Sequence, residues 1–336
     1  MKQERILMAH GSGGLMSQRL IDEVFKQAWH NEIMESMLDG AILDLPAGKV
    51  AMSTDSFVIT PLFFPGGDIG KLSICGTVND LLACGARPLY LATAFIIEEG
   101  FLISDLRLIA ESMAKTAREV GVKLVTGDTK VVEKGSADGV FINTTGIGVI
   151  PKGIDYRPQR IQPDDKVIVT GYIGDHGLAI LAQREGLSFS TPTLSDCAPL
   201  YQLGEMVSKY GAAIKCMRDP TRGGLATVLN ELASQAGVGI RVKESDIPVS
   251  AVVQGACDML GMDPLYMANE GKMVVFVAAD AAQDLLADLH KLPQTENAAM
   301  IGHVSPEPVG MVLIETELGA ERILGTLEGE HVPRIC

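Results

Sequence analysis

Apolar residues in the first part of the chain recur at spacings that predict helices alternating with strands. Helical spacing over residues 72–84 predicts a helix that is buried on one side, and Gly85 and Pro88 end it. The same patterns predict helices over 15–29 and 104–120, and strands over 41–45, 49–60, 89–97, 122–126 and 140–150. This alternation predicts an α+β domain over residues 1–150.

A polar stretch with several prolines, residues 151–163, separates this domain from a second one. The second half repeats the alternation, with strands predicted over 166–171, 238–243, 273–279, 301–304 and 309–315 and helices over 195–210, 225–236, 249–260 and 280–290. A length of 336 residues also favours two domains. We therefore expect a second α+β domain over 151–320 and a polar tail over 321–336 that leaves the Cys336 thiol reachable.

Composition narrows the class of protein. The formal net charge of −14 argues against a surface for nucleic acid or anionic membrane, since either needs basic patches. The chain has no run of eighteen apolar residues and no signal-peptide pattern. Its six cysteines form no CxxC pair, and the five other than Cys336 fit reduced core positions. These features favour a cytoplasmic protein of enzyme type.

Aspartates at the ends of predicted elements are candidate metal ligands. Asp80 interrupts the apolar helix beside Asn79, where a carboxylate is costly to bury without a partner. Asp55, Asp128 and Asp219 lie in turns or strand ends, and three of these four aspartates have a glycine nearby. Oxygen ligands of this kind suit Mg²⁺, but each aspartate could equally be a helix cap or a solvated turn residue. Spacing alone leaves both explanations open.

Other candidate residues are similarly ambiguous. Residues 8–14 form a Gly-rich loop before a helix, which can bind phosphate but is neither GxGxxG nor the Walker pattern. Lys130 and Lys134 could neutralise a transferred phosphate. Glu270 could be a general base, although an ordinary turn carboxylate explains it as well. For His176, a structural role and a substrate contact are equally open.

Six segments, in order along the chain, resemble the HypE family of hydrogenase maturation proteins, within the ATP-dependent enzymes that are similar to aminoimidazole ribonucleotide synthetase (PurM-like). They are residues 9–14, 53–57, 77–88, 127–130, 219–224 and 269–271. The Val-Asn-Asp and Thr-Asp-Ser motifs are common to the superfamily. The C-terminal Val-Pro-Arg-Ile-Cys is far more specific to the HypE family.

The resemblance implies a two-domain fold, each domain with helices on one face of a mixed sheet, and a homodimer formed through the first domain with ATP near the interface. It implies an ATP-dependent carbamoyl dehydratase that converts a carboxamide on its own Cys336 to a thiocyanate. A carbamoyltransferase would supply the carboxamide, and an iron-carrying assembly complex for [NiFe]-hydrogenase would receive the cyanide.

The resemblance also implies residue roles, with ATP and Mg²⁺ as cofactors. Metal ligands would be Asp55, Asp80, Asp128, Asp219 and, from its position alone, Asp39. ATP would contact Gly11, Ser12, Gly13, Gly14, Asn79, Thr129, Arg222 and Gly223. Cys336 would carry the substrate, Glu270 would act as base, and Lys130 or Lys134 would bind the γ-phosphate.

Two alternatives remain at this stage. A superfamily relative could phosphorylate a small molecule, such as selenide or thiamine phosphate, although no cysteine precedes Cys75 to serve a selenide-type enzyme. A non-enzymatic carrier or scaffold could use the terminal thiol to transfer a metal or ligand. Neither a small-molecule kinase nor a scaffold requires ATP-dependent chemistry on Cys336.

Overall fold

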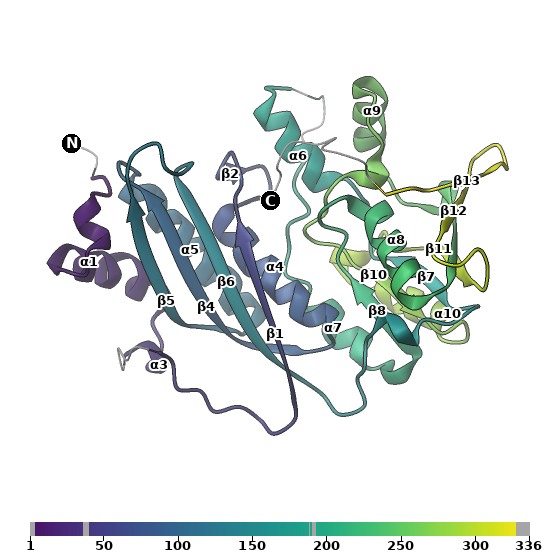
Figure 1. Cartoon of the computed structure of the whole chain (residues 1–336), viewed down its shortest axis with the longest axis horizontal. Coiled ribbons are helices and arrows are strands. Elements are labelled where there is room, and N and C mark those ends of the chain that lie inside the picture. The colour runs from purple at the N-terminus through teal and green to yellow at the C-terminus, as the bar shows by residue number, and fades with distance from the viewer. Residues whose placement is uncertain (1–3, 36–39, 188, 190–192, 327–336) are drawn as a thin grey trace.

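The computed structural model describes residues 4–35, 40–187, 189 and 193–326. Within these residues no helix is long and apolar enough to span a membrane. The chain forms two α+β units, seen side by side in Figure 1, which confirms the expected fold class.

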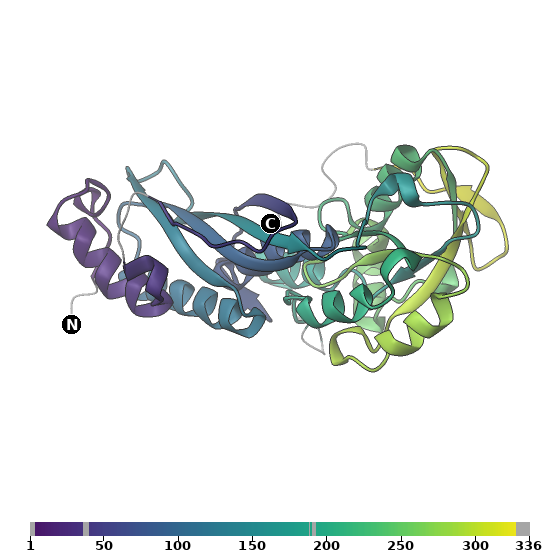
Figure 2. The same cartoon turned by 90° about the horizontal axis from the view of Figure 1, so that it is seen from below.

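The first unit is a mixed four-stranded sheet in the order β1 (Lys49–Phe57), β6 (Val140–Ile150), β4 (Arg87–Glu98) and β5 (Lys123–Val132). Only β4 and β5 run parallel among these pairs. The helices α1 (Leu15–Leu20), α4 (Ile69–Ala83) and α5 (Ile103–Val120) lie on one side of the sheet, as Figure 2 shows. Short elements complete the unit: the helical segments Met8–Gly11 and Ile21–Lys26, α2 (Gln27–Trp29), α3 (Glu32–Glu35), β2 (Phe63–Phe64) and β3 (Gly67–Asp68).

Helix α4 is the helix that the sequence predicts, but 12 of its 15 residues are buried, so it is covered on nearly all sides and not on one side alone. It begins three residues earlier than the apolar pattern, because the Asp68 side chain accepts hydrogen bonds from the N–H groups of Gly70 and Lys71 and caps the helix. Glycines let it lie close to the sheet: a Cβ on Gly146 would come within 2.7 Å of Thr77. This close packing fixes Asp80 relative to β1.

The other face of this sheet carries exposed apolar side chains. Val50, Met52 and Ile96 are 46%, 69% and 43% exposed. Residues on β1 alternate between this uncovered face and the helix-covered face, where Asp55 and Phe57 lie. A bare apolar sheet face of this kind is typical of an interface.

The second unit is a seven-stranded sheet in the order β13, β12, β9, β11, β7, β10 and β8. The strand bounds are β7 (Lys166–Val169), β8 (Ile214–Arg218), β9 (Gly239–Lys243), β10 (Val274–Val277), β11 (Ala299–Ser305), β12 (Val312–Glu315) and β13 (Glu321–Ile323). Its α-helices are α6 (Asp175–Arg184), α7 (Tyr201–Ser208), α8 (Gly224–Ala236), α9 (Ala251–Leu260) and α10 (Ala282–Leu289). One hydrophobic cluster includes Leu72 and Val78 of α4 together with Leu200 and Val275, so the two units share a core.

Three local predictions were wrong. Residues 41–45 are not a strand, and the helix predicted from Ser195 begins only at Tyr201. Strand β5 continues to Val132 instead of ending at Thr126. This last difference places Asp128 and Lys130 within a strand.

Candidate functional site

A cavity of about 520 Å³ lies where the two units meet, and acidic side chains from both units line it. We call it the carboxylate pocket. Its acidic residues are Asp55 from β1, Asp219 just after β8, and Glu270 just before β10. Asn143 of β6 also lines it and donates to the Asp55 carbonyl oxygen at 2.9 Å, which holds this edge strand in place. The fold thus unites three acidic residues that lie far apart in the sequence.

Asp80 lies beside this pocket. The Ser53 hydroxyl donates to its carboxylate at 2.6 Å. Burial raises the pKa of Asp80, the Ser53 hydrogen bond offsets part of that rise, and the charge of Asp55 adds to it. Burial, followed by the charge of Asp80, raises the pKa of Asp219 to about 7. These carboxyl groups therefore repel one another, and a cation among them would relieve the repulsion.

The only ion pair described for these aspartates is weak: Arg222 lies 3.8 Å from Asp55, and its side chain is 81% exposed. Within the described residues, no group of three or more His, Cys, Asp or Glu side chains is arranged to hold a metal ion. Mg²⁺ usually takes one or two carboxylates, several waters and substrate phosphates. The donor set therefore fits Mg²⁺ brought with a nucleotide, and it does not form a closed cage.

Glu270 is the most unusual side chain in the carboxylate pocket. It is 5% exposed, and within the described residues its carboxyl has no hydrogen-bond or ion-pair partner. Burial, followed by the nearby Cys197 and Asp219, raises its pKa well above the usual value. A buried carboxyl without a partner is costly to keep unless it is used in chemistry.

Asn79 has a different role from the nucleotide contact that we expected. Its side chain is buried and donates to the carbonyl oxygens of Ala198 and Glu270, at 3.1 and 3.3 Å. Its own oxygen accepts from the N–H of Leu200 at 2.9 Å. These bonds occupy both ends of the amide and link α4 to the second unit, so we no longer expect Asn79 to bind ATP.

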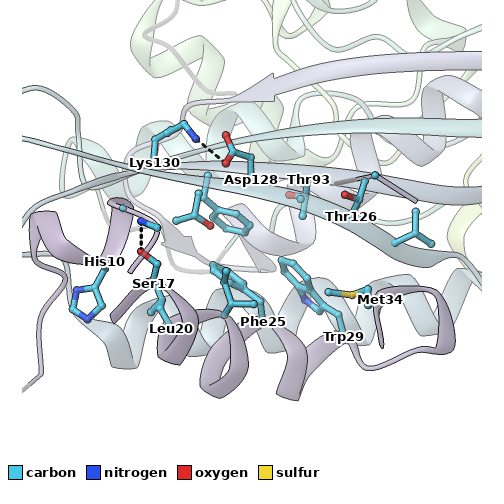
Figure 3. Close-up of a pocket in the computed structure, with 18 of the residues that line it drawn as sticks. His10, Ser17, Leu20, Phe25, Trp29, Met34, Thr93, Thr126, Asp128 and Lys130 are labelled. Carbon is cyan, nitrogen blue, oxygen red and sulfur yellow. Dashed lines mark hydrogen bonds and ion pairs between the residues drawn. The ribbon is translucent and has the colours of Figure 1, made fainter. Parts of the chain in front are cut away.

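A second cavity, of about 300 Å³, lies between the N-terminal helices and strands β4 and β5. We call it the aromatic pocket (Figure 3). The rings of Phe25, Trp29 and Phe95 pack together along it, with centroids 4.9 to 5.9 Å apart. Gly11, Gly13 and Thr129, which were predicted to bind the nucleotide, also line it. An aromatic wall beside a Gly-rich loop suits a nucleotide base and its phosphates.

The Gly-rich loop is a helical turn followed by the start of α1. Gly11 lies so close to β5 that a Cβ would come within 2.7 Å of the Val131 nitrogen. Ser12 N–H is directed at the Ala9 carbonyl, and the Gly13 N–H donates to the Ser17 hydroxyl. Several loop N–H groups thus already have partners, although the loop lies directly beside the aromatic pocket.

Asp128 and Lys130 form an ion pair at 2.8 Å at the rim of the aromatic pocket. Asp128 is in register with Ala94, Asn143 and Ser56 on the three other strands. Residues in register point to the same face of a sheet, and Ser56 lies on the uncovered face. Asp128 and Lys130, two residues apart on β5, therefore lie on that face as well. Asp55 is on the opposite face and three strand spacings away, about 14 Å. The sequence interpretation placed Asp128 in one set of metal ligands with Asp55, Asp80 and Asp219. Within a single chain, Asp128 instead lies apart from the other three.

The remaining candidates are placed as follows. Lys134 is exposed, in a loop that the Glu98 carboxylate anchors by accepting from the N–H groups of Gly135 and Gly139. Gly223 caps α8 in a left-handed conformation. His176 is fully buried and lies 2.7 Å from the Ser195 hydroxyl, which indicates a structural role. Asp39 and Cys336 lie outside the described residues, and Gly14 begins α1 as its N-cap.

Sequence interpretation missed several residues that shape the site. Ser53 is adjacent to the Thr-Asp-Ser motif, and Asn143 lies on a strand with no distinguishing pattern. Asp196 had been assigned to a helix that the structure does not contain there. Only the position of Ser53 beside a recognised motif could have identified it in advance.

Comparison with known proteins agrees with this geometry. Residues 37–150 match the N-terminal domain, and residues 162–315 the C-terminal domain, of the AIR synthase related protein family. Carbamoyl dehydratase HypE of Rhizobium leguminosarum bv. viciae is 49% identical over 99% of this chain and 95% of its own length. A crystal structure of hydrogenase maturation protein HypE in complex with ATP is 47% identical, with a TM-score of 0.94, over 98% of this chain and 99% of that chain.

A chain in the crystal structure of a HypE–HypF complex is 49% identical, with a TM-score of 0.81, over 92% of this chain and 99% of that chain. Similarity of this extent, over both units and in solved structures, exceeds what a shared fold alone requires. The chain belongs to the HypE carbamoyl dehydratase family, within the AIR synthase related proteins.

Proposed function

We propose that this protein dehydrates a carboxamide carried on its own Cys336, using ATP, and so makes the thiocyanate that supplies cyanide for the iron of [NiFe]-hydrogenase. The observation that carries the proposal is Glu270: a buried carboxyl without a partner faces the same cavity as Asp55 and Asp219. Family membership and the resemblance to an ATP-bound HypE structure support it.

The chemistry needs two steps. The carboxamide oxygen attacks the γ-phosphorus of ATP, so the phosphoryl group moves to that oxygen and ADP leaves. The nitrogen loses its first proton to solvent as this O-phosphorylated imidate forms. Glu270 then accepts the second nitrogen proton as the carbon–oxygen bond breaks, which leaves a carbon–nitrogen triple bond and inorganic phosphate. Mg²⁺ would neutralise the phosphate charges when bound, with Asp55, Asp80 and Asp219 as its ligands in one chain. A substrate on the protein's own tail has a high effective concentration.

We propose that the aromatic pocket binds the base of ATP, with the phosphates directed past Gly11 and Gly13 toward Lys130. Stacking of a base on an aromatic side chain contributes about 1–3 kcal/mol. Lys134 is a second candidate for the γ-phosphate, because the loop that carries it is held near β5 by Glu98. Arg222, at the rim of the carboxylate pocket, is free to turn toward phosphates from the other side.

The protein's single tryptophan reports directly on this pocket, since Trp29 lines it. We expect ATP to change the Trp29 emission in a saturable way. Trp29→Phe should lose the signal and keep ATP binding within about threefold by calorimetry, because the aromatic wall remains. If calorimetry shows that ATP binds to the wild-type protein but the emission stays constant, the base lies elsewhere.

A homodimer would form one nucleotide site from residues of both copies. Asp128 and Lys130 lie on the uncovered sheet face together with Met52 and Ile96, while Asp55 lies on the other face. We propose that two copies pack these faces together, so that Asp128 and Lys130 of each copy contribute to the nucleotide site at the interface. Exposed apolar side chains on the face and the division of the acidic residues both support this arrangement.

Met52→Lys is expected to weaken this dimer at least about tenfold, because it introduces charges into the centre of an apolar interface. Leu108→Lys is the matched control: Leu108 is 54% exposed on α5, and the helices cover the face opposite Met52. Sedimentation equilibrium measures the association of all three proteins. A wild-type monomer, or a Met52→Lys dimer of wild-type strength, would contradict the arrangement.

The partners follow from the chemistry. A carbamoyltransferase must supply the carboxamide, and the similarity to the HypE chain of a HypE–HypF complex supports such a partner. An iron-carrying hydrogenase assembly complex would accept the cyanide.

The decisive test is mass spectrometry of the C-terminal peptide after carbamoylation, with and without Mg-ATP. We expect ATP to remove one water from the modified Cys336 and to release ADP and phosphate in equal amounts. Cys336→Ser is the control, because its hydroxyl is a much poorer acceptor for the carbamoyl group. An unchanged peptide mass in the presence of Mg-ATP would refute the proposal, and persistent ATP use by Cys336→Ser with a small substrate would favour a small-molecule kinase.

A further inference from the structure

The backbone around Glu270 is held by side chains from other segments. The Glu270 and Gly271 N–H groups both donate to the Asp196 carboxylate, at 3.0 and 3.2 Å. The Glu270 carbonyl oxygen accepts from Asn79 at 3.3 Å. Hydrogen bonds therefore hold both the N–H and the carbonyl oxygen of Glu270, one on each side of its Cα. Such bonds restrict where the side chain can point.

Asp196 is itself fixed in place. Its side chain is 2% exposed, and Lys272 lies 3.8 Å away as its counter-charge. Gly271 packs so tightly that a Cβ would lie 1.9 Å from the Asp196 carbonyl oxygen, which leaves room only for glycine. The carboxylate of Asp196 accepts two N–H bonds with both oxygens, an arrangement that defines direction as well as distance.

Asn79 connects this unit to the metal-binding side of the site. Its bonds to Ala198 and Leu200 hold the segment that begins with Asp196. The next residue along α4 is Asp80, and consecutive helical residues point about 100° apart. One turn of α4 therefore sets the position of Asp80 and of the Glu270 turn together.

A third side chain ties the turn to Asp219. Asn269 donates through its N–H and its side-chain amide to the Pro220 carbonyl oxygen, at 3.1 and 2.9 Å. Its side-chain oxygen accepts from the N–H of Gly174 at 2.7 Å. Asn269, which precedes Glu270, is thus hydrogen-bonded to Pro220, which follows Asp219. These bonds connect the Glu270 turn to Asp219.

We propose that Asn79 and Asp196 are positioning residues, which hold the Glu270 carboxyl in register with Asp80 and Asp219. The inference rests on the proposed function, in which Glu270 is the base. Reaction geometry depends steeply on such alignment, since a displacement of about 1 Å can cost about 10²-fold in rate. Both residues act through the backbone of Glu270 and do not touch the substrate.

Asp196→Asn tests the inference, because an asparagine offers one acceptor oxygen where the two N–H groups need two. We expect the dehydration kcat to fall about 10²-fold while KM for ATP and the Trp29 titration stay within about twofold. Asp175→Asn is the matched control: Asp175 lines the same small cavity as Asp196 and Lys272, but it makes no described hydrogen bond to the turn. It should leave kcat unchanged.

The double variant with Glu270→Gln separates positioning from general damage. If Asp196 acts through Glu270, adding Asp196→Asn to Glu270→Gln should cost little further rate, measured in single turnovers by peptide mass. An equal loss in both backgrounds, or a folded Asp196→Asn with wild-type kcat, overturns the inference. Asn79→Ala provides the second test and should show the same pattern if Asp196→Asn does not fold.

Failure of the inference is distinct from failure of the proposed function. An unchanged mass of the carbamoylated Cys336 peptide with Mg-ATP would refute the proposed function. A Glu270→Gln protein with wild-type dehydration activity would leave that function standing but remove Glu270 as the base and, with it, the positioning role. A slow Glu270→Gln protein together with an unaffected Asp196→Asn protein would refute only the positioning role.

Discussion

Glu270→Gln is expected to lower the rate of dehydration by about 10²- to 10⁴-fold, the usual contribution of a positioned general base. Glutamine has nearly the same shape but cannot accept the nitrogen proton. ATP binding should persist, because the aromatic pocket and Lys130 do not involve Glu270. Single-turnover mass spectrometry of the Cys336 peptide, with the Trp29 titration beside it, measures the two quantities separately.

Stability provides the control for this variant. Burial raises the pKa of Glu270, so the folded protein binds its proton more tightly than the unfolded chain does. A carboxyl whose pKa is higher in the folded state than in the unfolded state lowers the free energy of unfolding as the pH rises above the unfolded-state pKa. Below the unfolded-state pKa this loss is absent. Glutamine removes the loss, so Glu270→Gln should be at least as stable as the wild-type protein at neutral pH. A variant that is both slow and unstable would point to misfolding instead.

The fold could be predicted well where the hydrophobic pattern was strong. Helix α5 occupies 103–120 against a predicted 104–120, because its apolar stripe and its stop at Gly121 are both local signals. The start of α4 was missed because a cap by Asp68 is a single side-chain contact. Residues 41–45 form a mostly apolar run, as a strand often does, but no strand pairs with them within the part of the chain that the structure describes.

The candidate site could be predicted only in part. Asp55, Asp80, Asp219 and Glu270 were identified, and the fold brings them together from both units. The face on which Asp128 lies was not predictable, because the polar run that contains it has no alternation and strand β5 was expected to end before it. The roles of the adjacent residues Asn79 and Asp80 also could not be separated from the sequence. Asp80 borders the carboxylate pocket, whereas Asn79 is hydrogen-bonded to the second unit.

Asp80→Asn is expected to reduce activity about 10²- to 10³-fold at ordinary Mg²⁺ concentrations, and part of the loss should be recovered as Mg²⁺ is raised. The asparagine keeps the shape and can still accept from the Ser53 hydroxyl, so the change removes the charge and leaves the packing. Initial rates measured against Mg²⁺ concentration test this. Asp258→Asn, on the exposed side of α9, is the control and should match the wild-type curve.

The same variant separates function from folding in the metal-free protein. Burial and the charge of Asp55 make an ionised Asp80 unfavourable, so its folded pKa lies above the unfolded value and its stability contribution declines as the pH rises. Asp80→Asn should therefore unfold at the same or a higher denaturant concentration at neutral pH. A carboxylate kept where it destabilises the fold is the pattern of a ligand site, in which activity takes precedence over stability. A variant that loses stability but keeps the wild-type Mg²⁺ curve would assign Asp80 to the fold and leave the metal to Asp55 and Asp219.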